Sequence, residues 1–338
     1  MALIPFAQMK DTIKKAFINV GLSEDDAELC ATVHTQSSAD GVYSHGLNRV
    51  ERFCNYVKEG YVDVKACVDV VKENGCICIL DGNRGIGIKN AITAVNKAME
   101  LASAHGVGIV ALRNTTHWMR GGSYGLMAAQ KGYMAICFTN TESCMPAWGA
   151  VNNHLGNNPF VIALPQGDDV MLLDMAMSQY SYGKLTTTRL AGEKLPYPGG
   201  FDENGVLTDD PGAIEKSMRI LPTGMWKGAA MTIMLDALAA ALSAGSCTKE
   251  IDEINRGSCT GCSQIFMVFD PKSFAGAEMT QHITKTVCDY VNASEPDEHT
   301  SLVCYPGQRS LMRRKKNMAE GIPADDGVFA AVSKIAGV

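Results

Sequence analysis

Two polar segments of this sequence place a histidine close to an arginine. Residues 43–49 read YSHGLNR, so His45 lies four residues before Arg49 where a helix is expected to open, and one helix face can carry both side chains. Histidine exchanges protons near neutral pH, and the arginine fork grips a carboxylate through paired hydrogen bonds. The segment could therefore hold a small anion and deliver a proton to it. Taken alone, a histidine at a helix start is more often a cap or a solvated group.

The second segment, residues 116–122, reads THWMRGG and contains His117 and Arg120. It follows an expected strand and precedes a helix, which is where ligands bind in α/β proteins. Two further stretches, Asn157-Asn158-Pro159 and Trp226-Lys227-Gly228, are typical of a turn and of a helix entry when considered alone. Residue types and spacing thus mark a candidate site without naming its reaction.

Several common motifs are missing from the sequence. The glycines of residues 82–87 (GNRGIG) are out of register for the dinucleotide fingerprint G-x-G-x-x-G, and Gly183-Lys184 lacks the upstream glycine of a phosphate-binding loop. The G-x-S-x-G pattern of serine hydrolases is absent as well. The residues alone therefore indicate an α/β enzyme of unknown chemistry.

The elements that must position these residues form a helical region followed by an α/β region. Apolar residues recur at three and four spacing over 6–20, 27–33 and 47–57, and Ser23 with Asp26 resembles a capping box. Continuous apolar runs predict strands, and two long helices are expected over 88–104 and 229–242. The predicted strands cover residues 76–80, 108–112, 134–138, 160–164, 170–173, 265–269 and 302–304.

The rest of the chain contains a long irregular stretch and C-terminal helices. Residues 181–225 carry many Gly, Pro, Asp and Thr residues, which predicts an extended loop structure that shapes a site. Helical patterns return over 277–291, 311–319 and 329–335. We therefore expect a mainly helical domain over 1–74 with contributions from the C-terminal helices. A mixed α/β cofactor- and substrate-binding domain follows over 75–270, and helices over 271–338 pack back on both.

Composition limits the functions that the chain can have. Its 338 residues are 46% apolar and 20% charged, with a formal net charge of -6 and dispersed basic residues, so neither nucleic acid nor an anionic membrane is expected as a partner. No apolar run approaches the roughly 20 residues needed to span a bilayer, and no signal-like segment opens the sequence. These features predict a cytoplasmic protein.

Twelve cysteines lie in apolar strings or on helical faces, which fits a reducing compartment better than a disulfide framework. Cys259 and Cys262 have the spacing of half a zinc site, but no second pair accompanies them, so we expect no metal. A non-catalytic protein that binds metal or uses its thiols is the alternative that this cysteine pair leaves open.

Taken together, the segments resemble the malate/L-lactate dehydrogenase family of non-Rossmann nicotinamide enzymes over nearly the whole chain. The resemblance rests on residues 41–46 (GVYSHG), 111–114 (ALRN), 117–125 (HWMRGGSYG), 219–222 (RILP) and 226–228 (WKG). It implies a homodimer with a mixed-sheet cofactor domain and a mainly helical domain. It also implies reduction of a small 2-keto acid by NADH, with NADPH as the other candidate, and His45 as the proton donor.

The resemblance also assigns the other site residues. It implies catalytic roles for His45, His117 and Asp202, with Asp202 orienting or charging His45, and substrate contacts for Ser44, Arg49, His117 and Arg120. The implied cofactor contacts are Val170, Met171, Leu172, Leu173, Asp174, Met175, Ala176, Trp226, Lys227, Gly307, Gln308 and Arg309.

One departure from the family affects the cofactor. The segment that usually ends in Pro-Gly-His-Glu reads Pro306-Gly307-Gln308-Arg309 here, and an arginine in place of an acid would favour a ribose phosphate. The choice between NADH and NADPH therefore stays open. Sister activities also stay open, namely malate, lactate and ureidoglycolate dehydrogenases and cyclic-imine reductases, because one fold supports many substrates.

Overall fold

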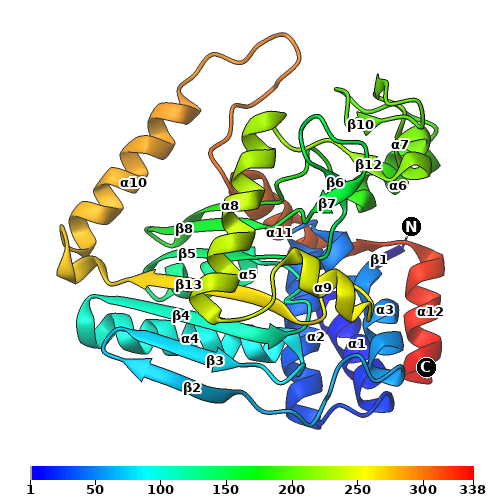
Figure 1. Ribbon diagram of the computed structural model, residues 1–338. Helices are drawn as coiled ribbons and strands as arrows, with labels where there is room; N and C mark the ends of the chain where they lie inside the picture. The colour runs from blue at the N-terminus through cyan, green and yellow to red at the C-terminus, as the bar shows by residue number, and fades with distance from the viewer. Residues whose placement is uncertain (1) are drawn as a thin grey trace.

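The computed structural model describes residues 2–338 and has a mixed seven-stranded sheet at its centre (Figure 1). The strand order is β2-β3-β4-β13-β5-β8-β9, in which only β3 and β4 run parallel. The strands are β2 (Asp69–Asn74), β3 (Ile77–Asp81), β4 (Val107–Thr115), β13 (Cys262–Phe269), β5 (Met134–Thr139), β8 (Phe160–Gln166) and β9 (Asp169–Met175). Six of the seven predicted strands are confirmed.

Helices cover both faces of this sheet. α4 (Gly87–His105) and α5 (Gly122–Gln130) pack on one face, in a core that includes Trp118, Tyr124 and Phe266. α8 (Trp226–Ser243) packs on the other face through Leu235 and Ala239. Because side chains alternate between the two faces of a strand, the continuous apolar runs of the central strands supply both cores.

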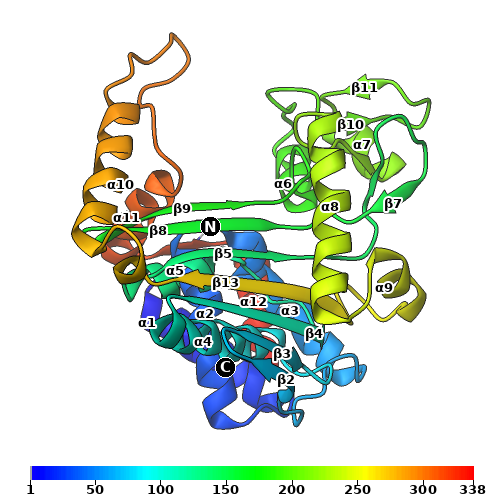
Figure 2. The same cartoon turned by 60° about the vertical axis from the view of Figure 1, so that its left-hand side comes forward.

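A helical layer lies beside the sheet and contains both ends of the described chain (Figure 2). α1 (Phe6–Asn19), α2 (Glu24–Ala39), α3 (Leu47–Lys58) and α12 (Asp326–Ala336) share a core that includes Phe17 and Phe53. β1 (Ala2–Ile4) pairs antiparallel with β14 (Ile322–Ala324). Segments from opposite ends of the sequence thus build one layer.

The remaining elements surround the strand ends. α10 (Ala277–Asn292) contacts β8, whereas α11 (Gln308–Glu320) contacts α2 and β9. A small sheet of order β11-β10-β12 lies beside α6 and α7. These and the other short elements are α6 (Tyr182–Leu190), β10 (Gly200–Phe201), β11 (Leu207–Thr208), α7 (Pro211–Ser217), β12 (Arg219–Ile220), β6 (Met145–Pro146), β7 (Asn153–Leu155), α9 (Thr248–Ile254), η1 (Tyr43–His45) and η2 (Pro271–Ser273).

Two predictions about elements were wrong. Residues 302–304 form no strand, and 181–225 contain two helices, one of them started by the Ser181 hydroxyl, which accepts the Lys184 N–H. The strand β2 was not predicted; it lies at one edge of the sheet, and every one of its residues is exposed. A strand with no buried face has no apolar alternation by which to recognise it.

Within residues 2–338, no single helix is both long and apolar enough to span a membrane. α8 and α9 reach that length and hydropathy only when they are taken together, and they are bent by 76° at the break between them.

Candidate active site

The two histidine segments meet between the helical layer and the sheet. His45 ends η1, His117 lies in the turn between β4 and α5, and their ring centroids are 5.6 Å apart. A cavity of about 10 Å³ lies beside His117, enough for about one water molecule. Its polar lining consists of Arg49, Tyr56, Thr116, His117, Ser258 and Thr260.

Helix α2 fixes the position of the His45 turn. The Ser38 hydroxyl accepts the Leu47 N–H at 2.9 Å, and His34 Nδ1 donates to the Gly46 carbonyl at 3.0 Å. A Cβ on Gly46 would come within 2.1 Å of Ser38 Oγ, so only glycine allows this close approach. The turn that carries His45 is therefore held from behind by buried contacts.

His117 has a defined tautomer. Its Nδ1 accepts the backbone N–H of Met119 at 2.8 Å, so a neutral ring carries its proton on Nε2. Met119 adopts a left-handed φ of 64°, which brings that N–H back to the ring. Burial, followed by the nearby Arg49 and His45, holds the pKa of His117 well below its usual value. His117 is thus a neutral hydrogen-bond donor.

His45 is also neutral at pH 7 in the ligand-free protein. Burial lowers its pKa to about 3, and the positive charges of Arg49 and Arg120 add to the effect. Its Nδ1 lies 3.0 Å from the Ser44 hydroxyl. An anion that offsets the charge of Arg49 would remove part of this repulsion and raise the pKa of His45.

Arg49 is the half-buried cation of this cavity. One of its terminal nitrogens donates to Ser258 Oγ at 3.2 Å, and burial lowers the pKa of its guanidinium. No carboxylate in the part of the chain that the structure describes forms an ion pair with Arg49 within 4.0 Å. Its charge therefore has no direct counterion.

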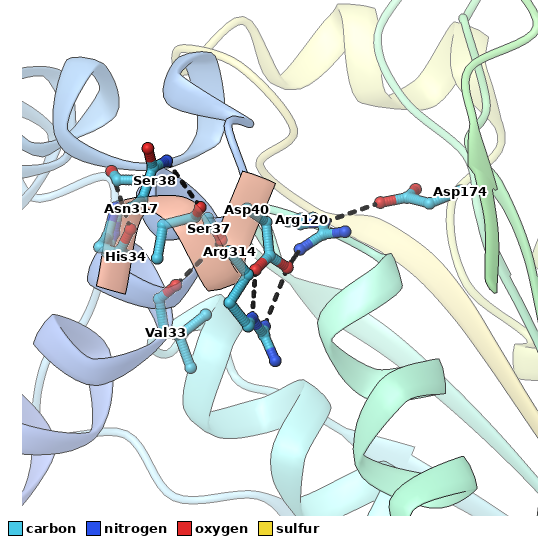
Figure 3. Close-up of polar contacts among 10 residues, drawn as sticks. Val33, His34, Ser37, Ser38, Asp40, Arg120, Asp174, Arg314 and Asn317 are labelled. Carbon is cyan, nitrogen blue, oxygen red and sulfur yellow. Dashed lines mark hydrogen bonds and ion pairs between the residues drawn. The ribbon is translucent and has the colours of Figure 1, made fainter. Parts of the chain in front are cut away.

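Arg120, in contrast, is fully engaged in a buried cluster of charges (Figure 3). Its guanidinium pairs with Asp40 and also with Asp174 of β9, at 3.3 Å, and Arg314 of α11 donates to Asp40 at 2.9 Å. The side chains of Arg120 and Asp40 are only 5% and 4% exposed. The cluster joins the end of α2, the start of α5, β9 and α11, which leaves Arg49 as the arginine that is open to a substrate.

The predicted cofactor segments converge on the edge strand β9. Leu172 N–H donates to the Pro306 carbonyl at 3.0 Å, and a Cβ on Gly307 would lie 3.0 Å from the Leu172 backbone. At the far end of β9, the Met177 carbonyl accepts the Thr223 N–H at 2.8 Å, just before Trp226 and Lys227 open α8. Segment 307–309 therefore lies against the middle of β9, and the segment that leads into Trp226 and Lys227 lies just beyond its C-terminal end.

These segments fit a dinucleotide. Gly307 caps α11 with φ 91° and no side-chain hydrogen bond. The Gln308 N–H donates to the Tyr305 carbonyl at 3.2 Å, and the N–H groups that follow it in the first turn have no intrahelical partner, as phosphate binding requires. Arg309 follows directly and is exposed, with one terminal nitrogen 3.4 Å from the Leu302 carbonyl. Gln308 is turned inward, because its side-chain oxygen accepts the Tyr305 N–H at 3.2 Å.

Asp202 is not joined to His45. Its carboxylate accepts the backbone N–H groups of Asn204 and Val206, at 2.9 and 2.8 Å, and so closes its own turn after β10. Within residues 2–338 no hydrogen bond or ion pair links it to either histidine.

The structure adds residues that the sequence did not identify. Ser258 and Thr260 line the cavity, and Gly183 of α6 approaches Ser44, since a Cβ there would lie 3.1 Å from the serine Cβ. The signal for the first two was their place beside Cys259 and Cys262, whose spacing drew attention to the thiols instead. Both thiols are buried, and Thr260, which lies between them, lines the cavity.

Comparisons with known proteins agree with this geometry. A family model described as malate/L-lactate dehydrogenase matches residues 4–333. The 2,3-diketo-L-gulonate reductase of Klebsiella pneumoniae (strain 342) is 39% identical over 332 residues, which cover 98% of this chain and 99% of that protein.

Two solved structures have the same fold. The malate dehydrogenase from Pyrococcus horikoshii OT3 superposes with a TM-score of 0.90 at 25% identity, covering 99% of this chain and 95% of that one. The delta1-piperideine-2-carboxylate reductase from Pseudomonas syringae superposes with a TM-score of 0.86 at 25% identity, over 99% and 100% of the two chains. The mixed-sheet α/β fold predicted from the sequence is confirmed.

Proposed function

This chain belongs to the malate/L-lactate dehydrogenase family and is an NAD(P)-dependent oxidoreductase; we propose that it reduces a small 2-keto acid, with 2,3-diketo-L-gulonate as the first candidate. The product of that reaction would be 3-keto-L-gulonate. Support for this substrate comes from relatives that are 39% identical over almost the full length. We propose NADH as the preferred cofactor.

One observation carries the proposal. Arg49 presents a guanidinium without a direct counterion in a cavity that it lines together with His117, and the His117 ring lies 5.6 Å from the ring of His45. A 2-keto acid has a carboxylate next to the carbonyl that is reduced. If Arg49 binds that carboxylate through its fork, the adjacent carbonyl lies against the histidines.

The two imidazoles then have different tasks. NAD(P)H, when bound, supplies a hydride to the carbonyl carbon, which leaves negative charge on the oxygen. His117 donates its Nε2 proton as a hydrogen bond to this oxygen and keeps that proton, because its Nδ1 is occupied by Met119 N–H. His45 gains a proton when the substrate anion offsets Arg49, and passes it to the oxygen.

The cofactor would lie along β9. The N-terminus of α11 and Arg309 suit its phosphates, and Trp226 with Lys227 would cover it from the start of α8. Asp174 pairs with Arg120, so the strand proposed to hold the cofactor is tied to the segment between β4 and α5 that carries His117.

A second copy of this chain is the partner that we propose for its apolar surface. α8 and α10 stand at opposite ends of the strands (Figure 2), and both expose large apolar side chains. Water-exposed side chains of this size on two helices favour a homodimer interface. They are Met231, Ile233, Met234, Leu238 and Leu242 on α8, and Met279, Ile283, Val287 and Tyr290 on α10.

The test follows NADH absorbance while 2-keto acids are offered, including 2,3-diketo-L-gulonate, pyruvate, oxaloacetate and a cyclic imine. We expect His45→Gln to bind cofactor normally and to reduce substrate at least about 100-fold more slowly, the usual contribution of a positioned acid. Full activity in this variant would remove His45 from the mechanism. Faster turnover of another compound would replace the substrate but keep the chemistry.

A further inference from the structure

Residues 256–262 form a tight loop between α9 and β13 that is pinned to α3. The Ser258 N–H donates to the Tyr56 hydroxyl at 2.9 Å, and a Cβ on Gly257 would lie 2.7 Å from the Tyr56 ring. Cys259 adopts a left-handed φ of 56°, which few non-glycine residues adopt. The loop is therefore held in one shape, with Ser258 at the cavity.

A carboxylate holds this loop from the other side. Glu142 lies in the segment between β5 and β6, and its two oxygens accept the Ser258 hydroxyl at 2.7 Å and the Cys259 N–H at 2.8 Å. The Ser258 hydroxyl donates its hydrogen bond to Glu142 and accepts one from Arg49 at 3.2 Å. A row of hydrogen bonds thus links three segments that are far apart in the sequence, running from Arg49 through Ser258 to Glu142.

This row of hydrogen bonds places the negative charge of Glu142 one hydroxyl away from Arg49. A hydroxyl between the two groups passes on orientation, because an oxygen that donates to a carboxylate is a stronger acceptor for the guanidinium. The Ser258 hydroxyl also occupies only one nitrogen of the Arg49 guanidinium. A direct ion pair with Glu142 would instead take the position that a substrate carboxylate needs. Arg49 is oriented and still available.

We propose that Glu142 and Ser258 are positioning residues that hold Arg49 for the substrate carboxylate, an inference that rests on the substrate-binding role proposed for Arg49. The segment around the two cysteines then serves the reaction through its serine. Its thiols pack behind that serine beside Ile251.

The first experiment compares two serines that donate to carboxylates. We expect Ser258→Ala to raise the KM for the 2-keto acid about tenfold or more, the range of one hydrogen bond to a charged group, with little change in the KM for NADH. Ser258→Thr keeps a hydroxyl and should restore much of the loss. The matched control is Ser143→Ala, because the exposed Ser143 hydroxyl donates to Asp252 at 2.6 Å; its KM should not change.

A double-mutant cycle separates positioning from a general loss of structure. If Ser258 acts through Arg49, adding Ser258→Ala to Arg49→Met should cause no further rise in KM. Additive losses, or a Ser258→Ala enzyme with the wild-type KM, would overturn the inference. A thermal unfolding midpoint within a few degrees of wild type in each variant excludes misfolding as the cause.

A binding measurement keeps this inference distinct from the proposed function. Oxamate mimics a 2-keto acid and is not reduced, so calorimetry in the presence of NADH reports carboxylate binding without turnover. We expect Ser258→Ala and Glu142→Gln to weaken oxamate and Ser143→Ala to leave it unchanged. If no 2-keto acid is reduced but this pattern holds, the proposed reaction fails and the positioning role stands. If the wild-type enzyme binds no oxamate, both are wrong.

Discussion

Arg49 and Arg120 both lie near enough to His45 to lower its pKa, but their surroundings are opposite. Arg120 is 5% exposed and contacts two carboxylates directly, whereas Arg49 reaches its nearest carboxylate only through the Ser258 hydroxyl. A guanidinium with its charge fully compensated holds segments of the protein together, as Arg120 does for α2, α5, β9 and α11. A guanidinium without a direct counterion attracts an anion from solution. The same side chain therefore stabilises the fold in one place and prepares a binding site in the other.

The largest effect that we predict is on stability, from Arg120→Met. Removing this guanidinium takes one of two arginine partners from the buried Asp40 and an ion pair from the half-buried Asp174, which should lower the free energy of unfolding by about 3–5 kcal/mol. Chemical denaturation measures this loss. Arg189→Met is the control, since Arg189 pairs with Glu215 at a half-exposed site and should lose less than about 1 kcal/mol. Equal losses of stability in Arg120→Met and Arg189→Met would mean that the buried cluster stabilises the fold no more than an exposed ion pair.

Arg49→Met should show the reverse pattern. We expect kcat/KM for the 2-keto acid to fall about 100-fold or more, because a desolvated charge pair with the substrate is lost. The free energy of unfolding should stay constant or rise, since the change removes a charge that has no direct partner in the free enzyme. Arg49→Lys keeps the positive charge but not the planar guanidinium, so its kcat/KM should lie between those of the wild type and Arg49→Met. A destabilised Arg49→Met enzyme with normal kinetics would contradict this assignment.

A smaller effect concerns the loss of folding stability at low pH that His34, a neighbour of Arg49, should cause. Burial lowers the pKa of His34 to about 4, with Arg49 adding to the effect, so the folded protein keeps His34 neutral where the unfolded chain protonates it. Its contribution to stability is therefore present above pH 6.5 and lost as the pH falls, by about 2 kcal/mol between pH 7 and 5.

The variant His34→Asn tests this reasoning. Its amide can still donate to the Gly46 carbonyl but does not titrate, so the decrease in unfolding midpoint between pH 7 and 5 should become shallower. The exposed His299 is the control, and His299→Asn should leave the slope unchanged. An unaltered slope in His34→Asn would mean that other groups account for the acid sensitivity.

The smallest predicted effect involves an arginine at the surface. Arg309 lies where the adenosine end of the cofactor is proposed, and Arg309→Glu should weaken NADPH use about tenfold and spare or improve NADH use, if the side chain pairs with the 2'-phosphate. Steady-state kinetics with both cofactors decide it. Small and equal effects would assign the enzyme to NADH and make Arg309 a solvated residue.

The sequence predicted the central strands and the histidine segments because their signals are local. The apolar run at 134–138 becomes β5, and His45 and His117 stand in short polar segments between regular elements. It could not separate Arg49 from Arg120, since the carboxylates that decide their roles come from α2 and β9 in one case and from the segment after β5 in the other. Spacing along one helix contains no information about such partners.

Two further contacts could not be read from the sequence. The resemblance implies that Asp202 orients or charges His45, whereas in the fold its carboxylate accepts two N–H groups of its own turn. The segment 256–262 was considered for its thiols, because cysteine spacing is visible in a sequence. The contact of its serine with Arg49 spans 209 residues and is visible only in the fold.

The pairing of β1 with β14 affects how the protein is made. The Ala2 N–H donates to Asp326, which is 324 residues further along the chain, and α12 covers α1 and α3. During synthesis the apolar sides of α1 and α3 therefore leave the ribosome long before their covering helix exists. The sheet is also completed late in synthesis, because β13 pairs between β4 and β5. The nascent chain thus exposes surface for chaperones, or for aggregation, until its last segments emerge.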